Sequence, residues 1–467
     1  MNPRTWLAVA AGRLTGAASR AARRGGGTAV AGLVALHVDP RLPERLAAEL
    51  GHGSVIVTGT NGKTTTARML AAIAEQAGLR PVANTSGSNL MRGVATALLD
   101  ATDPLGRIRG AAGRLGVFEV DEATLPAAVR ALRPRAVVFT NLFRDQLDRY
   151  GEVDTVASLW REALAELDEE TTVVLGVDDP AIASLATAAP GPVVTFGIED
   201  TRDADDRVEH AADYRFCLSC GEELSYEAAF YGHLGHWRCP ACERARPAPD
   251  VRATCVTRQA GRSTRLALAT PAGEVRLDLP LAGLYNVENA LAATAGALAL
   301  GLPLDAVEPA LGSFRAAFGR QERFEVEGRE VLVLLAKNPT GLNQVLRTIA
   351  EQPGGDGLSL LLFLNDGIAD GRDISWIWDS DYELIAAQAS SVVVSGTRAD
   401  ELALRLKYAD LAIEPVVHAD TGVALDAALS RTAAGATLYV VPTYTAMLEV
   451  RELLARRGRV APYWEQG

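Results

Sequence analysis

The sequence predicts an α/β protein: a central domain built around a phosphate-binding loop, with a zinc ribbon inserted in it, followed by a second, Rossmann-like α/β domain. Three observations lead to this prediction. A strand, a glycine loop and a helix follow one another over residues 54–77, two cysteine pairs lie between residues 217 and 242, and strands alternate with helices again from near residue 319. A chain of 467 residues has room for about three such units.

The overall composition narrows the partners and the compartment. Lysine and arginine (46) are outnumbered by aspartate and glutamate (58), so the net charge is −12. An acidic chain lacks the broad positive field that holds a polyphosphate backbone, and we predict no nucleic-acid partner. Four of the five cysteines are clustered, unlike the dispersed disulfides of a secreted protein, which predicts a cytoplasmic location. No uninterrupted apolar run reaches the ~18 residues of a membrane span.

Residues 1–50 are predicted to form a helical segment joined to the central domain. Residues 1–38 contain five arginines and no acidic residue, and a three-glycine run at 25–27 interrupts them. A signal peptide is disfavoured because Gly-Arg at 12–13 breaks the first apolar stretch. Two interpretations remain open: an amphipathic helix that packs on the domain, or one whose basic face contacts anionic lipid.

Alternating strands and helices predict that the central domain, residues 51–318, contains a mostly parallel sheet with helices on both faces. An acidic and then cysteine-bearing insertion interrupts the pattern over about residues 203–249. A second alternation begins near Gly319, so we expect the C-terminal domain to span residues 319–467. The predicted strands are 54–58, 115–120, 136–140, 171–175, 192–196, 331–335, 358–364, 391–394 and 437–441, with a hairpin over 265–279. The predicted helices are 67–77, 123–132, 156–167 and 286–300.

The segment after the first predicted strand has the chemistry of a phosphate-binding loop. Its glycines allow backbone N–H groups to approach phosphate oxygens, Lys63 neutralises the outer phosphates, and the Thr64 hydroxyl can ligate Mg²⁺. Only two residues separate the two glycines, so the loop is shorter than the common pattern. The predicted ATP-binding residues of the loop are Gly59, Thr60, Asn61, Gly62, Lys63, Thr64 and Thr65.

Further motifs accompany this loop at residues 119–122, 140–148, 283–289 and 319–322. Together they resemble, in order, the motifs of the Mur ligases and folylpolyglutamate synthetases, which activate a carboxylate as an acyl phosphate and join it to an amine. The resemblance implies a Mur-ligase-like P-loop ATPase domain that binds ATP and Mg²⁺. It places Mg²⁺ on Glu119 and Thr64. It adds three residues to the ATP site, namely Asn286, Asn289 and Arg320.

Departures from the family pattern bear on the substrate. Gln146 stands where the family has histidine, which leaves a second metal site open. Lys337 replaces another histidine, and the aspartate of the same motif is missing from residues 335–339. Only about 50 residues precede the loop, so we expect no complete N-terminal domain of the kind that binds a UDP-sugar. A soluble UDP-muramyl peptide is therefore disfavoured as the substrate.

Two cysteine pairs have the spacing of a zinc ribbon. The motifs Cys-Leu-Ser-Cys and Cys-Pro-Ala-Cys are separated by 18 residues. Four thiolates complete a tetrahedral zinc site and leave no position for a catalytic water, so the role is structural. Free or redox-active thiols are the alternative, and His233 and His236 between the pairs are rival ligands. The predicted zinc ligands are Cys217, Cys220, Cys239 and Cys242.

The densest polar cluster lies over residues 364–379, after a predicted strand. Ligands gather at the carboxyl ends of strands in α/β domains, and Trp376 and Trp378 offer rigid contact area. The alternative to a ligand or partner site is a solvent-exposed turn whose tryptophans pack into the core. With the zinc ribbon, this motif resembles the ligase subunits of lipid II isoglutaminyl synthase over nearly the whole chain. That resemblance implies a GatD-type class I glutaminase as heterodimer partner, whose Cys–His pair is completed by one aspartate, with Asp370 preferred over Asp366 and Asp373.

The resemblance implies a carbon–nitrogen ligase of peptidoglycan synthesis that acts at the inner face of the membrane. ATP would phosphorylate the α-carboxylate of D-glutamate in the lipid II stem peptide, and ammonia would then displace phosphate to give D-isoglutamine. Lys63 and Mg²⁺ are expected to dominate the rate of phosphoryl transfer. The leftover Cys255 is predicted to be a buried inert thiol, so the partner must release the ammonia. The alternatives are a Mur- or folylpolyglutamate-type amino-acid ligase and a non-catalytic ATP-binding zinc scaffold.

Overall fold

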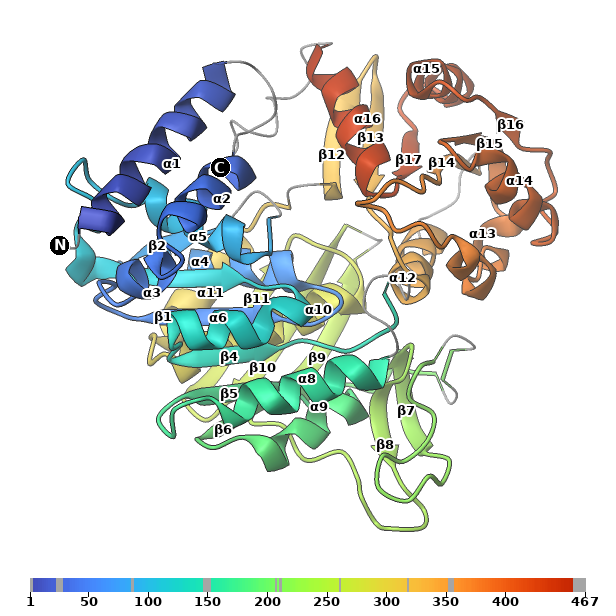
Figure 1. Cartoon of the computed structure of the whole chain (residues 1–467). Coiled ribbons are helices and arrows are strands. Elements are labelled where there is room, and N and C mark those ends of the chain that lie inside the picture. The colour runs from blue at the N-terminus through green and yellow to red at the C-terminus, as the bar shows by residue number, and fades with distance from the viewer. Residues whose placement is uncertain are drawn as a thin grey trace.

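The computed structural model describes residues 3–21, 28–84, 88–145, 153–205, 208–209, 212–259, 262–316, 319–351 and 357–456. Within these residues the strands form a nine-stranded sheet, a six-stranded sheet and a two-stranded hairpin. Figure 1 shows the six-stranded sheet at the upper right and the hairpin, β7 (Ser225–Tyr231) and β8 (Leu234–Arg238), at the lower right. The nine-stranded sheet fills the centre and lower left.

The nine-stranded sheet is parallel over most of its width. Its strands are β1 (Ser54–Thr58), β2 (Arg80–Ala83), β3 (Arg114–Glu119), β4 (Ala136–Phe139), β5 (Thr172–Gly176), β6 (Val193–Ile198), β9 (Val251–Gln259), β10 (Ser263–Thr270) and β11 (Gly273–Leu279). They lie in the order β11-β10-β9-β6-β5-β4-β1-β3-β2. Pairing is parallel from β2 to β9, and the hairpin β10–β11 extends the sheet through the antiparallel pair β9–β10. The predicted mostly parallel sheet is confirmed.

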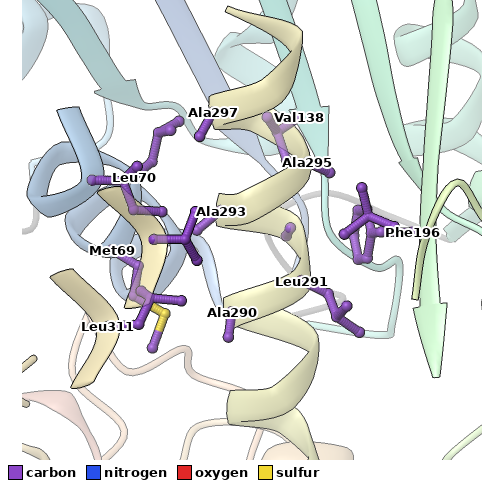
Figure 2. Packing of buried hydrophobic residues seen from close by; sticks show 14 of the residues in the cluster. Met69, Leu70, Val138, Phe196, Ala290, Leu291, Ala293, Ala295, Ala297 and Leu311 are labelled. Atoms are coloured by element: carbon purple, nitrogen blue, oxygen red, sulfur yellow. The ribbon is translucent and has the colours of Figure 1, made fainter. Parts of the chain in front are cut away.

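Helices cover both faces of this sheet, as the continuous apolar runs of its strands require. Val55 and Val57 of β1 face one apolar cluster and Ile56 faces the other. Figure 2 shows that alanines of α10 (Leu284–Ala299) face Met69 and Leu70 of α4 (Lys63–Gln76), which lets the two helices approach closely. The remaining helices around the sheet are α3 (Leu42–Ala47), α5 (Met91–Asp100), α6 (Leu125–Leu132), α8 (Val153–Ala165), α9 (Pro180–Ser184) and α11 (Val307–Gly312).

Two N-terminal helices, α1 (Pro3–Ala21) and α2 (Thr28–Val38), pack on each other, and α2 packs on α5. The helical character predicted for this segment is confirmed, and the glycine run lies outside the described residues. Among the helices of the described ranges, none is both long and apolar enough to cross a bilayer.

The six-stranded sheet forms the second α/β layer structure. Its strands are β12 (Arg320–Val326), β13 (Arg329–Leu334), β14 (Leu358–Phe363), β15 (Ala389–Ser395), β16 (Val416–Val417) and β17 (Thr437–Val441), in the order β12-β13-β17-β14-β15-β16. All pairs are parallel except β12–β13. One face packs on α12 (Pro339–Ala350), α13 (Glu383–Ala386) and α14 (Ala399–Lys407), and the other on α15 (Thr421–Arg431) and α16 (Tyr444–Arg456).

The β7–β8 hairpin lies within the cysteine-bearing insertion between β6 and β9. It is anchored to the end of β5, where the Trp237 indole N–H donates to the Val177 carbonyl (3.0 Å) and the Gly235 N–H donates to the Asp178 carbonyl (2.9 Å). These bonds fix the insertion to the nine-stranded sheet.

Candidate active site

A cavity of about 600 Å³ is lined by residues from both large sheets and their helices. Its size and mixed polar and apolar wall suit a small-molecule ligand. Of the residues predicted to bind ATP or Mg²⁺, all except Gly59 line this cavity. They are Thr60, Asn61, Gly62, Lys63, Thr64, Thr65, Glu119, Asn286, Asn289 and Arg320. The structure therefore brings together side chains that lie up to 260 positions apart in the chain.

The loop between β1 and α4 depends on its two glycines. The backbone is left-handed at both, with φ of 133° at Gly59 and 85° at Gly62. A Cβ at Gly59 would lie 2.1 Å from Thr140 Oγ1, and one at Gly62 would lie 2.0 Å from Asn289 Oδ1. Because only glycine avoids both the strain and the clash, the loop can place its N–H groups against a phosphate at the start of α4.

Lys63 is buried in the floor of the loop. Its ammonium donates to the Gly59 carbonyl, to the Thr60 carbonyl at 3.2 Å and to Glu122 Oε1 at 3.0 Å. Burial alone disfavours the charged form, but four neighbouring carboxylates, Glu122 foremost, outweigh it and raise the pKa of Lys63. The side chain is therefore a cation held in place at the mouth of a phosphate-binding loop.

The predicted magnesium ligands are in contact. Thr64 Oγ1 donates to Glu119 Oε2 at 2.7 Å, and both side chains are buried at the cavity wall. Asp121 and Asp145 line the same cavity. Hydroxyl and carboxylate oxygens are the ligands that Mg²⁺ prefers, so these residues fit the ion.

The asparagines of α10 face the loop from the opposite side. The Asn289 amide accepts from Thr66 Oγ1 and donates to Asn286 Oδ1, both at 3.2 Å, and Asn286 donates to the Ala282 carbonyl at 2.7 Å. Both asparagines are buried at the cavity wall. This chain of hydrogen bonds fixes α10 against α4.

The segment after β4 clamps the phosphate loop. Thr140 Oγ1 donates to the Asn61 carbonyl (2.8 Å), and Asn141 Oδ1 accepts from the Asn61 N–H (2.9 Å). The Thr60 hydroxyl accepts from the Phe143 N–H at 3.0 Å. The family-like motif at residues 140–148 thus shapes the loop through its first half, whereas Gln146 lies outside the described residues.

Two contacts join the phosphate loop region to the six-stranded sheet. Lys337 forms an ion pair with Asp145, and both line the cavity. Asn338 caps α12 and donates to Asn61 Oδ1 at 3.0 Å. The lysine that stands in place of the family's histidine therefore contributes a cation at the boundary between the two sheets.

Several cavity residues were not predicted from the sequence. Some lie within the motifs at residues 140–148, 283–289 and 335–339, and no local motif marks the others. Arg68 lies one turn after Thr64 in α4, so helical spacing from Thr64 could have indicated it, and its guanidinium carbon lies 6.0 Å from the centroid of the Phe314 ring. Tyr231 comes from the hairpin of the insertion, which no local pattern connects to the loop. The missed residues that line the cavity include Arg68, Asn141, Tyr231, Tyr285, Phe314, Asn338 and Tyr444.

The four cysteines of the insertion form one cluster, with all Sγ atoms within 4.8 Å of one another. Sγ–Sγ distances of 3.5 Å join Cys217 to Cys242 and Cys220 to Cys239. Burial opposes ionisation of Cys217, but backbone N–H groups of residues 219 and 220 outweigh it and lower its pKa to about 6, which favours the metal-binding thiolate. The cluster fits structural zinc and lies apart from the residues that line the cavity.

The other sulfur and imidazole groups are engaged elsewhere. His233 is buried with Nε2 3.3 Å from Asp179 Oδ2, and His236 Nε2 lies 2.8 Å from the Ile198 carbonyl. Neither belongs to the cysteine cluster, so the rival-ligand interpretation is wrong. Cys255 is partly exposed on β9 rather than buried.

The aspartates of the polar motif have different surroundings. Asp370 is buried and its carboxylate accepts from the Thr445 N–H at 2.8 Å and the Thr445 hydroxyl at 2.5 Å. This pins the loop to the start of α16. Ile368 and Ala369 of the same loop line the cavity.

Asp366 and Asp373 are nearer to solvent. Asp366 accepts from the Thr397 hydroxyl (2.8 Å) and pairs with Arg398 (3.2 Å), and these bonds lower its pKa. Asp373 is exposed and accepts only the Ser375 N–H (2.8 Å) among the bonds described. The structure therefore places the three aspartates in one loop but commits them to separate partners.

Comparisons with known proteins agree with this geometry. A family model described as the Mur ligase middle domain matches residues 57–237, and one described as the MurT ligase C-terminal matches residues 335–447. A solved structure of MurF from Acinetobacter baumannii superposes with a TM-score of 0.67 at 19% identity, covering 93% of this chain and 81% of that one. At that identity the likeness shows the fold.

Curated relatives cover the whole chain. Subunit MurT of the glutamine-hydrolyzing lipid II isoglutaminyl synthase from Streptococcus pneumoniae is 34% identical over 460 residues, 98% of both chains. The corresponding Staphylococcus aureus subunit is 31% identical over 455 residues, 97% of this chain and 98% of that one. The chain therefore belongs to the MurT family, with a Mur ligase middle domain at its centre.

Proposed function

We propose that this chain is the ATP-dependent ligase subunit of a lipid II isoglutaminyl synthase. It converts the α-carboxylate of D-glutamate in the lipid II stem peptide to the amide, D-isoglutamine, during peptidoglycan synthesis. The observation that carries this proposal is the end-to-end similarity to curated MurT subunits in a chain whose cavity holds the predicted nucleotide residues.

The first step is phosphoryl transfer from ATP to a carboxylate oxygen of the substrate. The bond between the γ-phosphorus and the ADP oxygen breaks, and an acyl phosphate forms. Lys63 and the N–H groups of the phosphate loop hold the transferring group in line and offset its charge. Magnesium, when bound, neutralises phosphate charge, and Thr64 and Glu119 are its proposed ligands.

The second step replaces phosphate by nitrogen. Ammonia attacks the acyl carbon, the C–N bond forms, phosphate leaves with the C–O electrons, and the nitrogen loses one proton. Because the cavity is lined by residues of both α/β units, the contacts of Asn338 with Asn61 and of Lys337 with Asp145 can hold the acyl phosphate away from bulk water.

A second subunit is proposed as the ammonia source, namely a GatD-type class I glutaminase. Release of ammonia from glutamine requires a nucleophilic cysteine with a histidine. Among the described residues no cysteine lines the cavity, and four of the five form the zinc-like cluster. Because lipid II is membrane-bound, the proposed place of action is the cytoplasmic face of the membrane.

The dependence of amidation on the nitrogen donor tests this function. The purified chain, ATP, Mg²⁺ and lipid II would be incubated with ammonium or glutamine, with and without the glutaminase, and the stem peptide analysed by mass spectrometry. We expect amidation with ammonium in both cases and with glutamine only when the glutaminase is present. Addition of a whole amino acid would show a ligase of the other type, and ATP binding without any product would show a scaffold.

A further inference from the structure

The outward face of the N-terminal helix pair is apolar. Side chains that soluble proteins usually bury stand out from α1 and α2 instead. Those with large exposed fractions are Leu14 (73%), Leu7 (54%), Val30 (46%), Trp6 (45%) and Leu33 (42%). Positions 7 and 14 are two helical turns apart, so they share one side of α1. We call these five residues the outer face.

The inward side of the pair is made of small residues, and this fixes which side points outward. A Cβ at Gly12 would lie 3.1 Å from the Ala35 Cβ and 2.8 Å from Leu99 Cδ1. A Cβ at Gly32 would lie 1.9 Å from the Arg92 carbonyl oxygen. Because the helices approach the domain this closely through glycine, neither can roll to bury its large apolar side chains without forcing bulk into these contacts.

The local charge indicates what covers the outer face. Residues 1–38 contain five arginines and no acidic residue, although the whole chain has a net charge of −12. Among the arginines whose side chains the structure describes, Arg4 is exposed, whereas Arg13 is half-buried and donates to the Thr102 and Asp103 carbonyls. A second copy would bring the same arginine-rich segment into a symmetric contact, where like charges oppose it. An anionic lipid surface offers both an apolar layer for the leucines and negative charge for the exposed Arg4, and Trp6 suits the boundary between them.

The position of the pair connects this face with the cavity. Figure 1 shows α1 and α2 at the upper left, on the opposite side of the nine-stranded sheet from the β7–β8 hairpin at the lower right. α2 packs on α5, and both the residues just before α5, 88–90, and Arg92 in its first turn line the cavity. A surface that docks on α1 and α2 is therefore separated from the cavity wall by one layer of helix.

We propose that the outer face of α1 and α2 docks the enzyme on an anionic bilayer. The inference rests on the proposed function for its purpose, since the lipid II substrate is embedded in that bilayer. Apolar insertion gives the affinity and the arginines add an attraction that salt screens.

Vesicle sedimentation of the full chain tests this inference. The probes are vesicles of phosphatidylcholine alone and of phosphatidylcholine with phosphatidylglycerol. The test variant is Leu7→Glu with Leu14→Glu. The matched control is Leu404→Glu with Val423→Glu. Leu404 (48% exposed) and Val423 (51% exposed) are also large apolar side chains on helix surfaces, on α14 and α15.

We expect the wild type and the control to sediment with anionic vesicles. The affinity of the test variant for these vesicles should be lower by on the order of tenfold or more. Trp6→Phe should remove the vesicle-induced blue shift of tryptophan emission. Absence of wild-type binding, equal binding by the test variant, or a dimer that the test variant dissolves would each overturn the inference.

A measurement of amidation rates distinguishes failure of the docking surface from failure of the proposed function. The test variant should amidate detergent-solubilised lipid II at the wild-type rate but lose rate on vesicle-embedded lipid II. If the wild type amidates neither substrate, the proposed function fails. If the test variant amidates both substrates at the wild-type rate, the docking surface alone is refuted.

Discussion

Lys63 is the residue on which phosphoryl transfer depends most in this structure. Its ammonium is buried, charged and held by two loop carbonyls and Glu122. We expect Lys63→Ala to reduce amidation at least ~100-fold, because a positioned cation at the transferring phosphate is lost. Steady-state amidation of lipid II measures this effect.

The control for that change is Lys407→Ala, which removes an exposed lysine from α14. It should leave amidation unchanged, and both variants should still bind the glutaminase in a pull-down. Substantial amidation by Lys63→Ala would refute the assignment of the loop.

The polar motif allows two roles of its aspartates to be separated. Asp370 is buried with its carboxylate on Thr445, so Asp370→Asn should lower the free energy of unfolding by about 1–3 kcal/mol. Asp373 is exposed, and Asp373→Asn should leave stability within about 0.5 kcal/mol of wild type. Chemical denaturation measures both values.

Asp373 is the most exposed of the three aspartates. We therefore propose that Asp373, rather than Asp366 or Asp370, completes the partner's Cys–His pair. Asp373→Asn should lose glutamine-dependent amidation and keep ammonium-dependent amidation. The reverse outcome, with only a stable Asp370→Asn losing the glutamine reaction, would restore Asp370.

Individual site residues could be predicted from the sequence where their role depends on neighbouring positions in the chain. The glycines, Lys63 and the cysteine pairs are recognisable because backbone geometry and metal spacing demand those residues at those positions. The position of Tyr231 at the cavity and the ion pair of Lys337 with Asp145 could not be predicted, because these residues meet their partners only after distant segments fold together.

Among the elements, the phosphate loop gives a sharp test of backbone conformation. Gly62→Ala would place a Cβ 2.0 Å from Asn289 Oδ1 in a left-handed residue, so ATP binding should be lost. Gly78→Ala is the matched control, because Gly78 has φ of 83° but no atom within 4 Å of a Cβ. It should cost about 1 kcal/mol of stability and retain ATP affinity in calorimetry.

The four-cysteine cluster, a candidate zinc site, is a second element with a direct test. The purified chain should hold about one zinc ion, and Cys220→Ser should lose it because three thiolates leave the site incomplete. Cys255→Ser, outside the cluster, should keep the metal. Elemental analysis under reducing conditions measures both, and zinc content near zero in the wild type would refute the site.

Sequence patterns located the elements that carry strong apolar runs, and missed those that do not. β1 and β17 have the predicted bounds because their residues are buried throughout or nearly so. β2 was missed because it is four residues long and contains Pro81, and β16 has only two residues. Such short strands are specified by the neighbours that pair with them.

For the whole molecule, we propose three units: residues 1–50, residues 51–318 with the insertion at about 203–249, and residues 319–467. The two large sheets on either side of residue 318 support this division. Contacts across it include Arg347 with Glu209 (3.3 Å) and Asn338 with Asn61 (3.0 Å). Residues on both sides of residue 318 line the cavity, so the candidate active site is built from both large units.

In the proposed reaction an acyl phosphate forms before the amide, and transfer of an oxygen isotope distinguishes this route from others. Lipid II whose D-glutamate α-carboxylate carries oxygen-18 at both oxygens would be amidated with ATP and ammonium, and the released phosphate analysed by mass spectrometry. We expect one oxygen-18 atom in each phosphate that accompanies an amide. Amide formation with phosphate free of oxygen-18 would contradict this route.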